Sequence, residues 1–398
     1  MNKTLFTPEQ FWTPEFQVNP HPTYHHFRDS SPLEYLFLPD GAVSGIKGDM
    51  REWAFMKYDD VYNAFRDHET FVSSRNPLYN ILFPRLPLSH DDPPRHTHFR
   101  RMLNKFFTLK NIESLTPTIK NIANTLLDKI TSREIDIMQS FAAAFPMIVT
   151  AHLLGIPAEN FAAFRHWAGV FIIINSLSPE EQHKNNQEIM AFFNQIMEAR
   201  RKRGADDMIT AFVKAEVDGK PLEDWEIWGL CALLFVAGSE TTTNLIGNTL
   251  NILAERPELW RQLRENRGLV NAVIEETLRY ESPVQRIQRQ TSREVVISGV
   301  KLPAKANISL FIGAANRDPR VFPDPDEFRL DRKSRNYLSF GAGIHACIGG
   351  LLARTETSIM LNALLDRFSN LQRGSEPTIR QTTSLLSCGF QQLPLLFR

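Results

Sequence analysis

One cysteine lies in a short segment whose neighbours could support metal chemistry. Residues 340–350 read Phe-Gly-Ala-Gly-Ile-His-Ala-Cys-Ile-Gly-Gly, with the cysteine at position 347. Gly341 and Gly343 permit tight turns with positive φ, which let the backbone approach a flat ligand closely. A helix is expected to begin just after Cys347, and its free N–H groups and positive dipole end would stabilise a thiolate. Such a thiolate can serve as an axial ligand to haem iron.

A zinc site is the alternative interpretation of this segment. His345 and Cys347 could supply two ligands, but no further Cys or His stands at zinc-binding spacing. Cys231 and Cys388 lack such surroundings and are expected to be small apolar residues of the core. Three cysteines do not form a disulfide framework, and they suit a reducing cytoplasm.

A second candidate site lies in a long predicted helix. The helix is expected over residues 221–256, closed by Pro257, and it contains the segment Ala237-Gly-Ser-Glu-Thr-Thr242. Glycine and β-branched threonine are poor helix formers, and local breaks in a helix often mark functional sites. A close helix crossing at Gly238, with Glu240 hydrogen-bonded to a neighbour, would explain the same residues.

Together with two other motifs, the cysteine segment resembles the haem-binding loop of the cytochrome P-450 superfamily. Glu276-Thr-Leu-Arg279 is similar to the Glu-x-x-Arg helix motif of that family, and residues three apart on a helix can pair. Asp324-Pro-Asp-Glu-Phe328, followed by Arg332, is similar to the family's meander, whose arginine completes a buried network with the Glu-Arg pair. The resemblance extends from about Asp59 to Pro394 and is nearest to small soluble bacterial members such as the camphor hydroxylase.

The resemblance implies a haem b cofactor with Cys347 as its axial ligand. Haem propionates need cationic partners when they are partly buried. His96 and Arg100 lie four apart on one helix face, and with Arg289 and His345 they match the family's propionate-binding positions. The remaining cofactor-binding positions of the loop are Phe340, Gly341 and Gly349.

Histidines near position 96 also allow simpler interpretations. His96 and His98 could be a pair of surface histidines. A metal site formed by His90, His96 and His98 has no supporting acid or thiol pattern.

Glu240 and Thr241 resemble the acid-alcohol pair with which the family activates oxygen. The resemblance implies that Glu240 relays protons inward and that Thr241 holds oxygen and a proton-donating water. Because the chemistry needs two protons without release of peroxide, a positioned hydroxyl beside an ionisable group is expected.

The expected substrate pocket is mostly apolar. Strand alternation sends Gln285, Ile287 and Arg289 to one side, so Gln285 and Ile287 face the substrate if Arg289 reaches the haem. The resemblance adds four wall residues, which are Leu233, Ala237, Leu386 and Ser387. Residues 171–174 are a candidate lid. Each of these residues could equally belong to the ordinary core.

The fold expected from these patterns is mainly α with a small β region, arranged as the triangular prism of the P-450 family. No Gly/Ser-rich or Pro-rich linker divides the chain, so residues 1–398 are expected to form one haem domain. Short strands are expected at residues 295–297 and 308–312, a strand and a short helix within residues 53–72, and a terminal hairpin over residues 385–397.

Composition excludes some partners. The formal net charge is zero, so nothing points to nucleic acid, and the N-terminus has no secretory pattern. The most apolar helical run, residues 230–237, is shorter than a membrane span needs, which favours a cytoplasmic location. No acidic residue stands between Asp92 and Glu113, so this basic helix is either a docking site for an acidic electron donor or a solvated face.

The expected function is insertion of one oxygen atom from O₂ into a small-to-medium hydrophobic molecule such as a terpenoid or steroid. Electrons would come from NAD(P)H through a separate ferredoxin and ferredoxin reductase. Three alternatives remain open: a peroxide-using member of the superfamily, a non-oxygenating haem-thiolate enzyme, and a haem-based gas sensor. The acid-alcohol pair argues against the first, because peroxide already supplies the protons and both oxygens.

Overall fold

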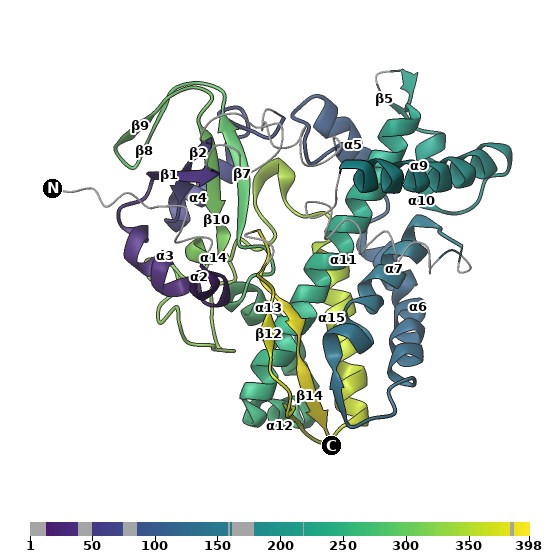
Figure 1. Ribbon diagram of the computed structural model, residues 1–398, viewed down its shortest axis with the longest axis vertical. Helices are drawn as coiled ribbons and strands as arrows, with labels where there is room; N and C mark the ends of the chain where they lie inside the picture. The colour runs from purple at the N-terminus through teal and green to yellow at the C-terminus, as the bar shows by residue number, and fades with distance from the viewer. Residues whose placement is uncertain are drawn as a thin grey trace.

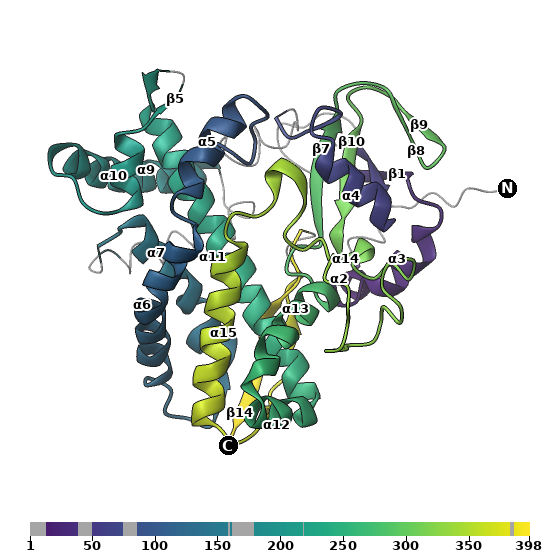
Figure 2. The ribbon, with the colours of Figure 1, turned by 180° about the vertical axis from the view of Figure 1, so that it is seen from behind.

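The chain folds into a mainly helical molecule with its main sheet toward one side (Figure 1). The computed structural model describes residues 13–38, 50–74, 86–157, 160, 179–217, 219–382 and 386–398. Figure 2 shows the ribbon from behind, and in both views the outline narrows toward the C-terminus. The mainly α fold class with a small β part is therefore confirmed. The candidate lid at residues 171–174 lies outside the described residues.

The longest helix, α11 (Asp224–Glu255), runs through the helical part of the molecule (Figure 1). A capping box starts it, because the side chains of Glu223 and Glu226 each accept a hydrogen bond from the other residue's backbone N–H. The helix begins later than expected because Lys220–Pro221 forms β6, which pairs with β5 (Glu216–Val217).

The helices that pack against α11 include α7 (Ala144–Leu154), α13 (Val270–Tyr280) and α15 (Gly350–Arg367). The other described helices are α2 (Pro14–Val18), α3 (His21–Arg28), α4 (Tyr58–Arg66), α5 (Arg95–Asn104), α6 (Leu109–Leu127), α9 (Pro179–Lys202), α10 (Met208–Val213), α12 (Pro257–Glu265) and α14 (Ile312–Ala315). Short 3₁₀ turns lie at Arg267–Leu269 (η5) and Gly343–His345 (η6), and a π-helix, η2 (Met138–Ala142), leads into α7.

Five strands form the main sheet, in the order β1–β2–β10–β7–β3. Their bounds are β1 (Leu33–Leu38), β2 (Met50–Phe55), β10 (Asn307–Phe311), β7 (Arg286–Thr291) and β3 (Phe71–Val72). β10 pairs in parallel with β2 and antiparallel with β7. A separate hairpin joins β8 (Val295–Ile297) to β9 (Val300–Leu302), so the strands expected near residues 295 and 308 are confirmed.

The C-terminal hairpin expected over residues 385–397 is wrong in its pairing. The two expected segments do form strands, β13 (Phe390–Gln392) and β14 (Pro394–Phe397). β13 pairs with β12 (Ile379–Arg380), whereas β14 lies between β11 (Leu371–Arg373) and β4 (Glu134–Asp136). Only Leu393 separates the two strands, which is too short a connection for a two-residue hairpin loop.

The hydrophobic core is continuous along α11. Its buried side chains pack into one cluster with α7, α13 and α15 and into a second cluster with α9 and α10. By length and composition α11 could cross a membrane, but 61% of its most apolar window is buried inside the fold. That burial is what a core helix of a globular protein shows.

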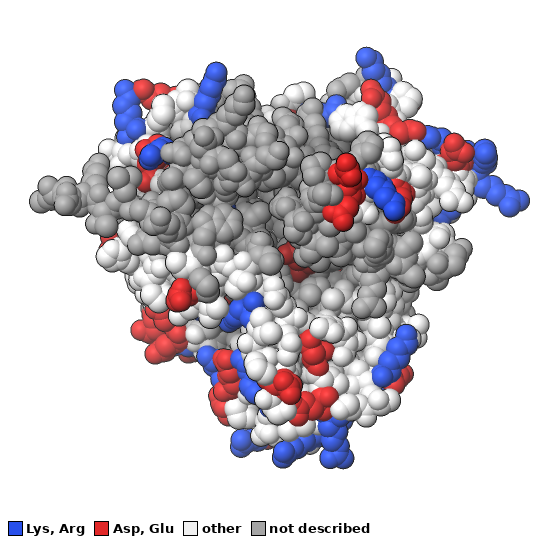
Figure 3. Space-filling view, viewed as in Figure 1, with Lys and Arg blue, Asp and Glu red and all other residues white. Residues whose placement is uncertain are grey.

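Charges are mixed over the described part of the face in Figure 3, where lysine and arginine lie among aspartate and glutamate. This agrees with the zero formal net charge of the chain. No strong field of one sign covers the described part of this face.

Candidate active site

The segment before Cys347 is a tight loop that needs its glycines. Gly341 and Gly343 have φ of 65° and 70°, the left-handed conformations expected from the sequence. A Cβ on Gly343 would lie 2.4 Å from the backbone oxygen of Phe65 in α4, so this position is closed to larger residues. The N–H of Cys347 donates to the carbonyl of Phe340 at 2.8 Å, which closes the loop just before α15.

The Cys347 side chain is exposed at the surface of the loop, but many protein atoms lie around its sulfur. Burial of the sulfur among protein atoms raises the pKa of the Cys347 thiol. Hydrogen bonds from the N–H groups of Gly349 and Gly350, and the charges of Arg100 and Arg354, act in the opposite direction. The loop therefore supplies donors for a thiolate, while a neutral thiol is favoured without a further positive charge at the sulfur.

Two arginines and two histidines, expected from the sequence to bind the propionates, are brought together beside this loop. The ring centroids of His96 and His345 lie 4.3 Å apart. Burial, and then the nearby charges of Arg289, His96 and Arg100, lower the pKa of His345 to about 2. Arg100 also donates to the carbonyl of Ala346 at 2.6 Å and so ties α5 to the loop.

His96 shows that this cluster suits an anionic ligand. Its side chain is buried, and in the described part of the chain neither ring nitrogen has a hydrogen-bond partner. An unpaired buried donor costs free energy, so a carboxylate placed here would satisfy the ring. A cysteine with backbone donors for a thiolate, and two arginines beside a buried histidine ring that is not hydrogen-bonded in the described part of the chain, fit the axial ligand and propionates of haem.

The acid-alcohol pair, Glu240 and Thr241, lies in the middle of α11. The two side chains do not bind each other, and each has its own hydrogen-bond partner. The Thr241 hydroxyl donates to the carbonyl of Ala237 at 2.7 Å, one turn earlier in the helix. The half-buried Glu240 carboxylate accepts a hydrogen bond of 3.0 Å from the hydroxyl of Ser387. A Cβ on Gly238 would lie 2.9 Å from the Thr150 hydroxyl of α7.

The close helix crossing at Gly238 and the neighbour for Glu240 are thus both present. They account for why glycine stands at this position and for how the acid is satisfied. They do not account for an ionisable carboxylate followed directly by a hydroxyl in the middle of a helix, and the catalytic interpretation stays a prediction.

The expected pocket residues come from α11, β7 and the segment before β13. Ala237 is exposed and precedes Glu240 by one helical turn, while Leu386 is 41% exposed and precedes Ser387. The Ser387–Glu240 hydrogen bond therefore places these two apolar side chains in the same region. Leu233 lies one further turn back on α11.

Gln285 is occupied by contacts within the protein. Its Oε1 accepts from the Tyr24 hydroxyl at 3.1 Å, and its Nε2 donates to the carbonyl of Ser282 at 2.8 Å. Gln285 precedes β7, in which Ile287 pairs with Leu310 of β10. The amide of Gln285 is therefore already hydrogen-bonded at both ends.

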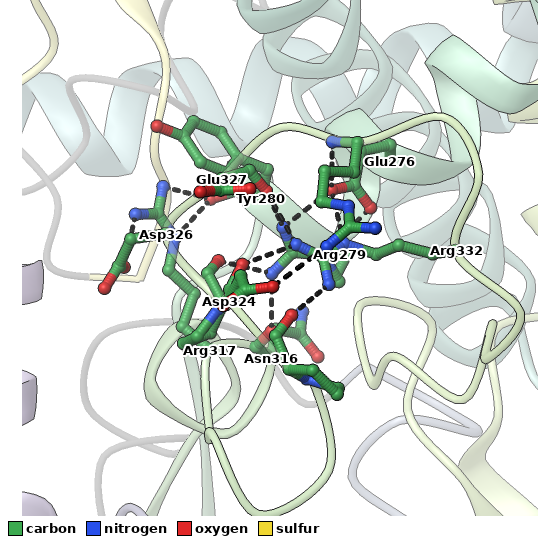
Figure 4. Close-up of polar contacts among 12 residues, drawn as sticks. Glu276, Arg279, Tyr280, Asn316, Arg317, Asp324, Asp326, Glu327 and Arg332 are labelled. Atoms are coloured by element: carbon green, nitrogen blue, oxygen red, sulfur yellow. Dashed lines mark hydrogen bonds and ion pairs between the residues drawn. The ribbon is translucent and has the colours of Figure 1, made fainter.

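A buried network of hydrogen bonds joins α13 to the irregular chain that follows α14 (Figure 4). Arg279 donates to both carboxylate oxygens of Glu276, at 2.7 and 2.9 Å. Nε of Arg332 donates to the same carboxylate at 2.8 Å, and its Nη groups donate to the carbonyls of Pro323, Asp324 and Glu327. Arg279 adds bonds to three further carbonyls, so the two guanidinium groups fix the irregular chain around residues 323–327.

Sequence reasoning missed a second ion pair near the loop. Arg354 donates to Glu275 at 2.6 Å and lies 4.3 Å from the centroid of the Phe340 ring. Tyr337 donates to the same carboxylate at 2.6 Å. The available signal was the position of Glu275 directly before the Glu-x-x-Arg motif.

Comparison with known proteins decides the family. A family model described as Cytochrome P450 matches residues 41–395. The chain belongs to the cytochrome P450 family. It is a P450 monooxygenase, and family membership implies a haem group.

The relatives of this P450 span nearly its whole length. It is 33% identical to Cytochrome P450 109 of Bacillus spizizenii, over 98% of this chain and 95% of the relative. It is 32% identical to Vitamin D(3) 25-hydroxylase of Pseudonocardia autotrophica, over 88% and 86%. The solved structure of CYP109E1 from Bacillus megaterium in complex with testosterone matches with a TM-score of 0.82 and 33% identity, covering 95% of this chain and 99% of that one.

Proposed function

We propose that this P450 binds haem b through Cys347 and hydroxylates a hydrophobic molecule of about steroid size. The observation that carries the proposal is that two features lie beside each other at the cysteine loop. Cys347 lies next to backbone donors for a thiolate, and the cluster beside it includes His96, whose ring nitrogens have no hydrogen-bond partner among the described residues. When bound, haem supplies the redox chemistry that activates O₂.

The proposed work of the cluster beside Cys347 is to hold the propionates. His96, Arg100, Arg289 and His345 would share this role, because charge-assisted hydrogen bonds are the strong ones in a desolvated site. Gly349 lies beside the sulfur, since a Cβ there would be in van der Waals contact with it at 3.9 Å, whereas Gly341 allows the positive φ of the loop. Phe340, with Arg354 above its ring, would cover the sulfur side of the loop.

Glu240 and Thr241 are proposed to manage protons at the site. Thr241 can exchange its bond to the Ala237 carbonyl for a water, since a threonine hydroxyl rotates to suit its partners. Glu240 is half-buried and ionisable, so it can pass a proton from solvent toward that water. A peroxide-using enzyme would not need this pair.

The substrate proposal rests on the wall residues and on the relatives. Leu233, Ala237, Ile287 and Leu386 offer apolar surface, which suits a molecule with few polar groups. One relative carries the name Vitamin D(3) 25-hydroxylase, and a structural relative was solved with testosterone. A steroid or a terpenoid of similar size is therefore the proposed substrate class.

Electrons are proposed to arrive from NAD(P)H through ferredoxin reductase and an acidic ferredoxin that docks on α5. Arg101 and Lys105 are exposed there and border a groove shared with Ala215, Glu216 and Val217. Arg100 of the same helix contacts the cysteine loop through Ala346, so the docking face lies next to the site. We place the protein in the cytoplasm, where such carriers are found.

Reconstitution tests the proposal. The purified protein should bind haem, and steroids or terpenoids should shift its Soret band by displacing water. With NADPH, ferredoxin, its reductase and ¹⁸O₂, the product should carry one labelled oxygen. Turnover driven by hydrogen peroxide alone, with no dependence on NADPH, would favour the peroxide-using alternative.

The matched control is Cys347→His, which should retain haem and lose the red-shifted carbon-monoxide difference band of a thiolate ligand. If the variant keeps that band, Cys347 is not the axial ligand.

A further inference from the structure

The Glu240 carboxylate is held by a residue far away in the sequence. The Ser387 hydroxyl donates to Oε1 of Glu240 at 3.0 Å, across 147 positions of the chain. The same oxygen of Ser387 accepts from Nε2 of Gln381 at 3.0 Å. Because the Gln381 amide takes a lone pair of the hydroxyl, the Ser387 proton is left to point at the carboxylate.

The segment that carries Ser387 is pinned on two sides. Ser387 forms a β-bridge with Val284, and the backbone carbonyl of Leu386 accepts from Gln285 N–H at 2.7 Å. On the other side, Nδ2 of Asn248 in α11 donates to the carbonyl of Cys388 at 3.1 Å. The hydroxyl of Ser387 is therefore fixed relative to the helix that carries Glu240.

Ser387 donates the one side-chain hydrogen bond that the described residues give to the Glu240 carboxylate. In the part of the chain that the structure describes, Glu240 forms no ion pair with lysine or arginine. Its neighbour Thr241 donates to Ala237 instead. A glutamate has three rotatable side-chain bonds, so without Ser387 its carboxylate would sample several positions.

We propose that Ser387 is a positioning residue that holds the Glu240 carboxylate for proton transfer, with Gln381 as its support. The inference rests on the proposed role of Glu240 as the proton relay. Ser387 was expected from the sequence only as a wall of the substrate pocket. The hydrogen bond gives it a different task, because misplacing a catalytic group by ~1 Å can cost up to ~100-fold in rate.

Three variants separate positioning from a wall role. Ser387→Ala should slow product formation roughly tenfold and raise the solvent deuterium isotope effect, while the spectral dissociation constant of the substrate stays within about twofold. Ser387→Thr keeps a hydroxyl and should restore most of the rate. Gln381→Leu should act in the same direction as Ser387→Ala, but more weakly.

A double-mutant cycle of Ser387→Ala with Glu240→Ala distinguishes failure of the proposed proton relay at Glu240 from failure of the positioning role of Ser387. If Glu240→Ala turns over like the parent, the proposed role of Glu240 fails. If Glu240→Ala is slow and Ser387→Ala has the parent's rate and isotope effect, the positioning role of Ser387 is overturned. It is also overturned if Ser387→Ala changes only substrate affinity or product pattern.

A readout that needs no turnover comes from urea denaturation of the same four proteins. The four proteins are the parent, Ser387→Ala, Glu240→Ala and the variant with both substitutions. The double variant should lose less free energy of unfolding than the sum of the two single variants, since each single substitution removes the same hydrogen bond. Additive losses would contradict the contact itself.

Discussion

Arg279 and Glu276 are joined by two hydrogen bonds between side chains that are 1% and 5% exposed. Arg279→Ala should lower the free energy of unfolding by about 3–5 kcal/mol, because it removes one of the two guanidinium partners of a buried carboxylate together with three hydrogen bonds to backbone carbonyls. Urea denaturation at neutral pH measures this. The matched control is Arg367→Ala, which breaks a pair with the 65% exposed Asp128 and should cost less than about 1 kcal/mol. Equal losses in the two variants would contradict a structural role for the Glu276 network.

Thr241→Ala should uncouple the reaction. Alanine is the better helix former, so α11 is kept while the hydroxyl is lost. NAD(P)H consumption should stay within about twofold, and product should fall roughly tenfold with a matching rise in hydrogen peroxide. Thr241→Ser retains the hydroxyl and should remain coupled, whereas Glu240→Gln should slow the whole cycle. All three quantities are measured in one assay, and unchanged coupling in Thr241→Ala would remove Thr241 from the mechanism.

Enlarging the proposed pocket wall should change where the substrate is oxidised. Ala237→Phe and Leu386→Phe each add bulk at an exposed apolar position near Glu240. Product ratios by mass spectrometry should shift, or substrate binding should be blocked, while haem content is kept. Val296→Phe, on the 63% exposed Val296 of β8, is the control and should leave the ratios unaltered. If both pocket variants give the same product ratios as the parent, Ala237 and Leu386 do not line the substrate pocket.

Charge reversal on α5 should weaken reduction by an acidic ferredoxin. Arg101→Glu combined with Lys105→Glu should slow electron transfer most at low ionic strength, because exposed charges are screened over ~10 Å at 0.1 M salt. Stopped-flow reduction measures the rate. The control reverses Arg261 and Arg264 of α12, which lies at the opposite end of the molecule (Figure 1). Identical low-salt rates for the α5 variant and the parent would exclude this docking face.

Features governed by local backbone chemistry could be predicted from the sequence. The positive φ of Gly341 and Gly343, the helix after the cysteine, and the division between α11 and α12 at Pro257 all follow from the residues at those positions. The Glu276–Arg279 pair follows in the same way, because residues three apart on a helix share one face.

Local patterns did not predict contacts between distant segments, and those that were expected, such as Arg332 with Glu276, came from the family resemblance. The alternation in residues 390–397 indicates strands but not their partners, so β14 was expected beside β13 and instead pairs with β4, about 260 positions earlier. The Ser387–Glu240 hydrogen bond is of the same kind, since nothing near either residue points to the other.

The docking of the cysteine loop on α4 has a consequence for biosynthesis. Gly343 packs against Phe65, and the hydroxyl of Tyr58 donates to the carbonyl of Asn336, 278 positions later, at 2.6 Å. During synthesis, α4 therefore leaves the ribosome long before the segment around residues 336–343 that packs against it. Domains with such distant contacts fold slowly and late. A nascent chain that is released early exposes the apolar face of α4 without its cover, which makes truncated products natural targets for chaperones and proteases.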